Sequence, residues 1–195
     1  MIAFSHKPVM LEECMHGLHL HSGGVYFDGT VGGGGHSCEI LRRTAPDGRL
    51  IATDLDDDAI AAAESRLSDF SGRYRIYKSN FKDFASVLER EGVDELDGVM
   101  LDFGVSSFQL DEVSRGFSYM QDAPLDMRMD ESAAFTAADV VNGYSREQLC
   151  RILRDYGEER FANRIAENIV RVRADHRIER TGELAQIAEE SIPAK

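Results

Sequence analysis

The first hundred residues alternate short apolar runs with segments of helical periodicity, and this alternation is the strongest constraint on the fold. Four apolar runs predict β-strands, at residues 25–28, 50–54, 74–77 and 98–102. Helical patterns separate them, near residues 36–43, 57–67 and 81–91. Repeated β-α units of this kind build a parallel sheet with helices packed against it. The N-terminal half therefore predicts an α/β fold.

The pattern changes after Asp102. Residues 103–131 are rich in Gly, Ser, Asp and Met without a sustained period, which predicts a long loop, and such loops are usually functional. Three helical segments are expected after it. One carries an apolar stripe of Leu149, Ile152, Leu153 and Tyr156, and the next carries one of Phe161, Ile165, Ile169 and Val172. The last begins with Thr181 as its N-cap.

These changes predict three regions. Residues 1–105 form the cofactor-binding core, residues 106–134 an active-site loop region, and residues 135–195 an all-α inserted domain. Four strands make a small sheet, and the sequence stops where further strands are expected. We therefore expect this sequence to be a fragment of a longer chain, with an incomplete sheet.

Composition narrows the class of protein. The 195 residues carry 22 basic and 35 acidic side chains, a net charge of −13, which by itself argues against generic nucleic-acid binding. Residues 146–180 differ, with nine arginines against seven acids. No apolar run approaches the roughly 18 residues of a membrane span, and no signal peptide pattern occurs. Three cysteines without a CxxC pair suit a cytoplasmic protein with reduced thiols.

A glycine-rich loop, residues 28–36, follows the first predicted strand and opens a helix. Consecutive glycines let the backbone approach a ligand closely, and ligands of open parallel sheets bind beyond the carboxyl ends of the strands. A flexible turn is the alternative. Asp54 ends the second strand, where a carboxylate commonly accepts hydrogen bonds from ribose hydroxyls. The alternative is that Asp54 belongs, with the acidic residues 56–58, to the solvated start of the next helix. Phe81 follows the third strand and lines either an adenine pocket or the core.

The acidic residues around this predicted site favour a cationic ligand over a dinucleotide, because negative charge repels a pyrophosphate. S-adenosylmethionine carries a sulfonium and an ammonium group and no phosphate. The residues therefore favour methyl transfer over hydride transfer.

Several motifs resemble the MraW/RsmH methyltransferases, bacterial and organellar enzymes that methylate N4 of a cytidine in 16S ribosomal RNA. The likeness spans nearly the whole chain. The motifs are His6-x-Pro8-Val9-Met10, Asp28-Gly29-Thr30-x-Gly32-x-Gly34-Gly35-His36-Ser37, Leu101-Asp102-x-Gly104-Val105-Ser106-Ser107-x-Gln109-Leu110-Asp111, Arg115-Gly116-Phe117-Ser118, Pro124-Leu125-Asp126-Met127-Arg128-Met129-Asp130 and Tyr156-Gly157-Glu158-Glu159-Arg160-Phe161-Ala162.

The resemblance implies a class I S-adenosylmethionine methyltransferase, with a Rossmann-like sheet and a helical domain inserted after the fourth strand. It also implies a longer chain and 16S rRNA of the small ribosomal subunit as partner. Carried over residue by residue, it assigns the cofactor contacts to Gly34, Gly35, His36, Asp54, Phe81, Asp102 and Gln109. The alternatives are a methyltransferase for another acceptor, or a fragment that binds cofactor or RNA without turnover.

Asp102 is the candidate catalytic residue. N4 of cytosine is a poor nucleophile whose proton must leave, and a carboxylate at the end of the fourth strand is placed to accept it. Holding the methionine part of the cofactor is the alternative role. Neither a metal nor a covalent intermediate is required, and the spacing of His16, His19 and His21 fits no standard zinc site.

Two groups of side chains are candidates for RNA contact. In the long loop, one of the aromatic residues Phe103, Phe108, Phe117 or Tyr119 stacks on the target base, or these rings are core. Arg128 contacts a phosphate or pairs with Asp126 or Asp130. In the helical region, Arg160, Arg164 and Arg171 share approximately one helix face, which meets RNA or is neutralised by neighbouring glutamates.

Overall fold

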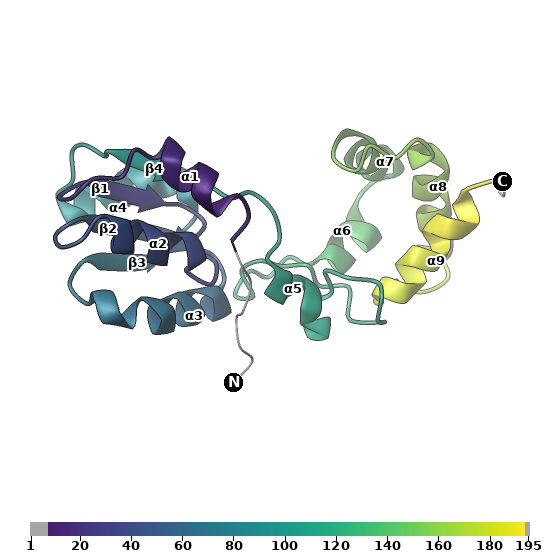
Figure 1. Cartoon of the computed structure of the whole chain (residues 1–195). Coiled ribbons are helices and arrows are strands. Elements are labelled where there is room, and N and C mark those ends of the chain that lie inside the picture. Colours follow the sequence, from purple (N-terminus) through teal and green to yellow (C-terminus); the bar gives the residue numbers. More distant parts are fainter. Residues whose placement is uncertain (1–7, 194–195) are drawn as a thin grey trace. The chain divides into compact units, whose positions relative to one another are not determined.

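Four parallel strands form the sheet of the N-terminal half, in the order β3-β2-β1-β4 (Figure 1). The strands are β1 (Val25–Asp28), β2 (Arg49–Asp54), β3 (Tyr74–Lys78) and β4 (Gly98–Met100). The computed structural model describes residues 8–193, so His6 of the N-terminal motif lies outside the described residues. All four predicted strands and the α/β class are confirmed.

The fourth strand is shorter than the predicted 98–102, because its main-chain pairing with β1 stops. The register pairs Tyr26 with Gly98 and ends with Asp28 opposite Met100. Beyond that point the Asp102 N–H donates to a side-chain hydroxyl, not to a main-chain carbonyl. Asp102 therefore lies just past the strand and not within it.

Helices cover both faces of the sheet. They are α1 (Leu11–Gly17), α2 (Gly35–Arg43), α3 (Asp57–Leu67) with the 3-10 turn η1 (Ser68–Phe70), and α4 (Phe84–Glu91), which follows the 3-10 turn η2 (Phe81–Asp83). Successive strand residues point to opposite faces. Tyr26 accordingly packs in one buried cluster with Ile40 of α2, whereas Phe27 packs in another with Val87 of α4.

The chain divides into two compact units, Met1–Gly104 and Val105–Lys195. The second unit contains α5 (Ser107–Asp111), the 3-10 turn η3 (Val113–Arg115), α6 (Ala137–Gly143), α7 (Arg146–Asp155), α8 (Ala162–Arg173) and α9 (Thr181–Ser191). Residues 106–134 are grouped with these helices. The core of the second unit includes Leu149 of α7, Ile165 and Ile169 of α8, and Ile187 of α9. Among residues 8–193, no helix combines the length and apolar character needed to span a bilayer.

Three details of the second unit differ from expectation. The long loop is partly ordered by α5 and η3. Tyr156, predicted to complete an apolar stripe, is 79% exposed because α7 ends before it. Thr181 is the first residue of α9 and Arg180 its N-cap. The buried Thr181 hydroxyl instead accepts a 3.0 Å hydrogen bond from the Ala123 N–H, so a tertiary contact replaces the predicted local cap.

Candidate functional site

The glycine-rich loop leads from β1 into α2 at the carboxyl edge of the sheet. A Cβ atom on Gly29 would lie 2.3 Å from Leu101 Cδ2 and 2.8 Å from Phe81 Cβ, so only glycine fits there. Gly32 and Gly34 have φ angles of 50° and 73°, a left-handed conformation that glycine adopts at little cost. The loop backbone therefore passes close to the segments that follow β3 and β4.

Five main-chain N–H groups of this loop have acceptors inside the first unit. The pairs are Gly29 to the Met100 carbonyl (3.0 Å), Thr30 to Asp28 Oδ1 (3.1 Å), Val31 to the Thr53 carbonyl (3.0 Å), Gly32 to Asp54 Oδ2 (2.8 Å) and Gly34 to the Val31 carbonyl (2.8 Å). Loops that cradle phosphates point such N–H groups at the ligand. Because these five donate internally, the loop is poorly suited to a pyrophosphate.

Asp54 ends β2 and is half-buried. Its Oδ2 accepts from Gly32 at 2.8 Å, and its Oδ1 accepts from the N–H groups of Leu55 and Asp56 at 2.8 and 3.1 Å. A carboxylate offers about four acceptor positions. One position on Oδ2 therefore remains for a further donor, such as a hydroxyl group.

Asp28 ends β1 and is buried, with 1% of its surface exposed. The Ser37 hydroxyl donates to its Oδ2 at 2.7 Å, and the Thr30 N–H donates to its Oδ1 at 3.1 Å. Burial raises the pKa of Asp28, and these hydrogen bonds oppose that rise. Asp28 therefore braces the loop from inside the protein.

Asp102 follows β4 and is exposed. Its N–H donates to the Thr30 hydroxyl at 2.7 Å, a contact between residues 72 positions apart in the sequence. Burial raises the pKa of the Cys14 thiol in α1, and the charge of Asp102 raises it further. The carboxylate of Asp102 thus lies close enough to α1 to act on it electrostatically.

Phe81 begins η2, three residues after the end of β3, and is half-buried. Its ring centroid lies 5.5 Å from that of Phe103, with the ring planes inclined by 60°. Phe103 is 70% exposed. This pair places an accessible aromatic surface in the segment that contains Asp102.

Gly35 and His36 begin α2 and pack against the N-terminal segment. A Cβ atom on Gly35 would lie 2.5 Å from Pro8 Cγ. The buried His36 ring places Nε2 3.0 Å from the Val9 carbonyl, which accepts the hydrogen bond when Nε2 carries the proton. The imidazole is thus engaged with Val9, whereas the first-turn N–H groups of α2 are of the kind that binds carboxylates.

Gln109 belongs to the second unit and is buried. Its side-chain oxygen accepts from the Ser106 N–H at 3.0 Å, and the Ser106 hydroxyl accepts from the Gln109 N–H at 3.1 Å. This reciprocal pair is a capping box that begins α5. Gln109 therefore has a local role in addition to the predicted cofactor contact.

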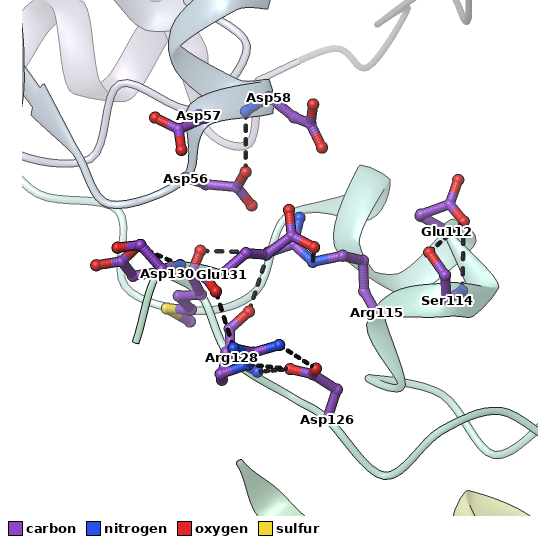
Figure 2. A network of polar contacts seen from close by, with 12 residues as sticks. Asp56, Asp57, Asp58, Glu112, Ser114, Arg115, Asp126, Arg128, Asp130 and Glu131 are labelled. Carbon is purple, nitrogen blue, oxygen red and sulfur yellow. Dashed lines mark hydrogen bonds and ion pairs between the residues drawn. The ribbon is translucent and has the colours of Figure 1, made fainter. Parts of the chain in front are cut away.

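Two arginines brace the loop before α6 (Figure 2). Arg128 pairs with both carboxylate oxygens of Asp126, at 2.8 and 2.6 Å, and donates to the carbonyls of Glu131 and Ala133. The hydrogen bonds from the Arg128 side chain to the Asp126 carboxylate lower the pKa of Asp126. Arg115 is buried and donates to the main chain of the same loop, at 2.9 Å to the Arg128 carbonyl. The structure thus bears out the Asp126 ion pair for Arg128.

The first unit thus brings six of the seven predicted cofactor residues to the carboxyl edge of its sheet or to the segments that follow it: Gly34, Gly35, His36, Asp54, Phe81 and Asp102. Sequence reasoning missed Thr30 and Arg115 as structural contacts, although both occur in the motifs. Among the described residues, His, Cys, Asp and Glu form no group of three or more that could hold a metal ion.

Comparison with known proteins identifies the family. A model described as the MraW methylase family matches residues 3–195. The chain belongs to the MraW methylase family. This match confirms the resemblance carried by the motifs and, with the parallel sheet, the predicted methyltransferase fold class.

Curated relatives of this MraW chain include the ribosomal RNA small subunit methyltransferases H of Symbiobacterium thermophilum and Clostridioides difficile. They are 52% and 50% identical over 193 and 192 residues, covering 99% and 98% of this chain. The alignments cover 61% and 62% of the relatives, so the chain spans about three fifths of their length. A SAM-dependent methyltransferase structure from Aquifex aeolicus aligns with 76% of this chain and 79% of its own at 15% identity, with a TM-score of 0.36.

Proposed function

We propose that this chain carries the S-adenosylmethionine site of an enzyme that methylates N4 of a cytidine in 16S rRNA of the small ribosomal subunit. The observation that carries the proposal is the carboxyl edge of the first unit. There, a glycine-rich loop, the Asp54 carboxylate and the segment of Asp102 follow adjacent strands. The family membership supports methyl transfer, and the names of the relatives support small-subunit rRNA as the acceptor.

The residues fit S-adenosylmethionine better than a dinucleotide. The Gly32 N–H donates to Asp54, so a pyrophosphate would have to displace a carboxylate that it also repels. The remaining acceptor position of Asp54 suits a ribose hydroxyl. We assign Phe81 to the adenosyl side of the cofactor and Gln109 to the pocket near its reacting end. The first-turn N–H groups of α2 are assigned to the carboxylate of the ligand.

When bound, S-adenosylmethionine supplies a methyl group activated by its sulfonium. The chain contributes alignment, which accounts for much of the acceleration in such displacements. Asp102 accepts a hydrogen bond from the N4 amino group of the cytosine, which favours the pyramidal nitrogen whose lone pair can attack. Once the nitrogen has taken up the methyl group, Asp102 receives the proton that the nitrogen must lose. The exposed ring of Phe103 provides a surface on which the target base can stack.

The second unit supplies candidate RNA contacts. Arg160, Arg164 and Arg171 are exposed, and within the described part of the chain none of their side chains forms a hydrogen bond or ion pair with another residue. Most other arginines of this unit have partners, such as Arg177 with Asp139 at 2.7 Å. We assign the three unpaired arginines to contacts with rRNA phosphates.

Two experiments test the proposal in order. Calorimetric titration of this chain with S-adenosylmethionine and with NAD should show binding of the first and not of the second. Incubation with small ribosomal subunits that lack the modification, followed by nucleoside mass spectrometry, should yield N4-methylcytidine. Binding of NAD alone would refute the cofactor assignment, and a methyl group on another acceptor would refute the substrate assignment.

A further inference from the structure

The hydroxyl of Thr30 takes a main-chain hydrogen bond at the point where β4 leaves the sheet. The last main-chain hydrogen bond between the two strands runs from the Gly29 N–H to the Met100 carbonyl at 3.0 Å. Two residues after Met100, the Asp102 N–H donates to Thr30 Oγ1 at 2.7 Å. A side chain of the glycine-rich loop thus replaces a carbonyl as the acceptor for the candidate catalytic residue.

Thr30 is itself held from the interior. Its N–H donates to Asp28 Oδ1 at 3.1 Å, and the other carboxylate oxygen accepts from the Ser37 hydroxyl of α2 at 2.7 Å. A buried carboxyl group is unfavourable unless its oxygens are hydrogen-bonded, and both oxygens of Asp28 are. A continuous series of hydrogen bonds therefore connects α2, Asp28, Thr30 and Asp102.

Packing acts on the residues beside Asp102 more than on Asp102 itself, since the Leu101 side chain lies against Gly29. Leu101, Asp102, Phe103 and Gly104 are all exposed, and Gly104 has a φ of 143°, which favours glycine. The ring contact of Phe103 with Phe81 acts one residue further along the chain. The hydrogen bond from the Asp102 N–H to Thr30 Oγ1 is thus the contact that acts on the backbone of Asp102 itself.

We propose that Thr30 is a positioning residue for methyl transfer, which sets the place from which the Asp102 carboxylate reaches the acceptor amine. This inference rests on the proposed function. The hydroxyl is needed as an acceptor, so serine can replace threonine and valine cannot. Because Thr30 acts through Asp102, its loss changes turnover more than the affinity for S-adenosylmethionine.

The test compares Thr30→Val and Thr30→Ser with the unsubstituted chain. In Thr30→Val, we expect the Asp102 amide to exchange with solvent at least about 10-fold faster by NMR, because its acceptor is gone. We expect kcat on unmodified small subunits to fall by about 10- to 100-fold, as misplacement of a reacting group does. The Kd for S-adenosylmethionine should change by less than about 3-fold, and Thr30→Ser should restore both exchange and kcat to within about 3-fold.

Thr44→Val is the matched control. Thr44 is buried and its hydroxyl donates to the Ile40 carbonyl at 2.8 Å, but it lies at the opposite end of α2 from the glycine-rich loop. This variant should lower the melting temperature and leave Asp102 exchange and kcat unchanged. It distinguishes a general loss of stability from the loss of the hydrogen bond between the Asp102 N–H and Thr30.

Three results would overturn the inference: unchanged Asp102 exchange in Thr30→Val, faster exchange with wild-type turnover, or failure of Thr30→Ser to restore kcat. Failure of the unsubstituted chain to bind S-adenosylmethionine or to transfer a methyl group would instead refute the proposed function. The exchange rates, which need no substrate, would in that case still decide whether Thr30 anchors Asp102.

Discussion

Three aspartates follow one another around the carboxyl edge of the first unit, and each has a different environment. Asp28 is buried and both of its oxygens are engaged. Asp54 is half-buried and retains one acceptor position, whereas Asp102 is exposed and is held through its main chain. Burial and hydrogen bonding thus separate a structural carboxylate, a candidate ligand-binding one and a candidate catalytic one.

Substitution of Asp102 tests the catalytic assignment. We expect Asp102→Asn to lower methyl transfer to unmodified small subunits by about 100-fold or more, because an amide cannot accept the proton of the amine. Turnover is measured by nucleoside mass spectrometry and cofactor affinity by calorimetry. Asp94→Asn, an exposed aspartate in the loop before β4, is the control and should be neutral. Near-normal turnover with unchanged affinity would eliminate both roles assigned to Asp102.

Asp139 in α6 should make the second unit sensitive to acid. Its pKa is lowered to about 2, first by the hydrogen bond from the Thr136 N–H and then by Arg177. The unfolded value is about 3.9, so the stabilising contribution is complete above that pH and is lost as the pH falls towards 2. We expect the melting temperature to fall less between pH 5 and pH 2 in Asp139→Asn than in the unsubstituted chain. An equal fall in both proteins would contradict this prediction.

At the scale of elements, the second unit depends on a short extended segment that joins its loop to its helices. Pro124 forms a β-bridge with Arg180, the Leu125 N–H donates to the Glu179 carbonyl at 2.8 Å, and Leu125 is buried. Gly116 passes against this segment with a φ of 68°, and a Cβ atom there would lie 2.2 Å from the Pro124 carbonyl oxygen. The loop that follows η3 therefore requires glycine at this position.

Gly116→Ala tests this packing. The new methyl group must displace main-chain atoms and adopt a left-handed conformation, so we expect a loss of unfolding free energy of about 1–3 kcal/mol or more. Gly143→Ala, at the end of α6 in the same unit, meets no atom within 4 Å and should be nearly neutral. Urea denaturation of both variants measures the difference. Equal stability of the two variants would show that the loop yields at Gly116.

At the scale of the whole molecule, charge is distributed unevenly. The chain carries a net charge of −13, but residues 146–180 carry nine arginines against seven acids. An acidic protein that binds RNA must present its cations together, since each phosphate contact releases a counterion and makes binding dependent on salt. The unpaired arginines of the second unit are the candidates for such contacts.

We expect Arg164→Gln combined with Arg171→Gln to weaken binding to a single-stranded fragment of small-subunit rRNA. The slope of log K against log salt should decrease by about 0.7 for each lost phosphate contact. Arg146→Gln, which removes an exposed arginine paired with Glu147 at 3.0 Å, is the control. Binding is measured by fluorescence anisotropy over a range of salt concentrations. Binding that is independent of salt, or an equal slope for all variants, would refute the assignment.

The sequence by itself determined the elements and predicted where along the chain the candidate site lies. The periodicity predicted all four strands and the bounds of α3, because alternation and helical spacing are local properties of consecutive residues. The glycine run predicted a loop that follows β1 and opens a helix, for the same reason. The motifs predicted the MraW family, and the comparison confirmed it.

The tertiary structure alone decided which polar groups are occupied. Threonine is a common N-cap residue, yet the Thr181 hydroxyl accepts a hydrogen bond from the N–H of Ala123, 58 positions away. In the same way, the Ser37 hydroxyl donates to Asp28 and the Gly32 N–H donates to Asp54. The Thr30 hydroxyl accepts from the Asp102 N–H. A hydrogen bond depends on distance and direction in space, and the chain brings these partners together only when the sheet and helices pack.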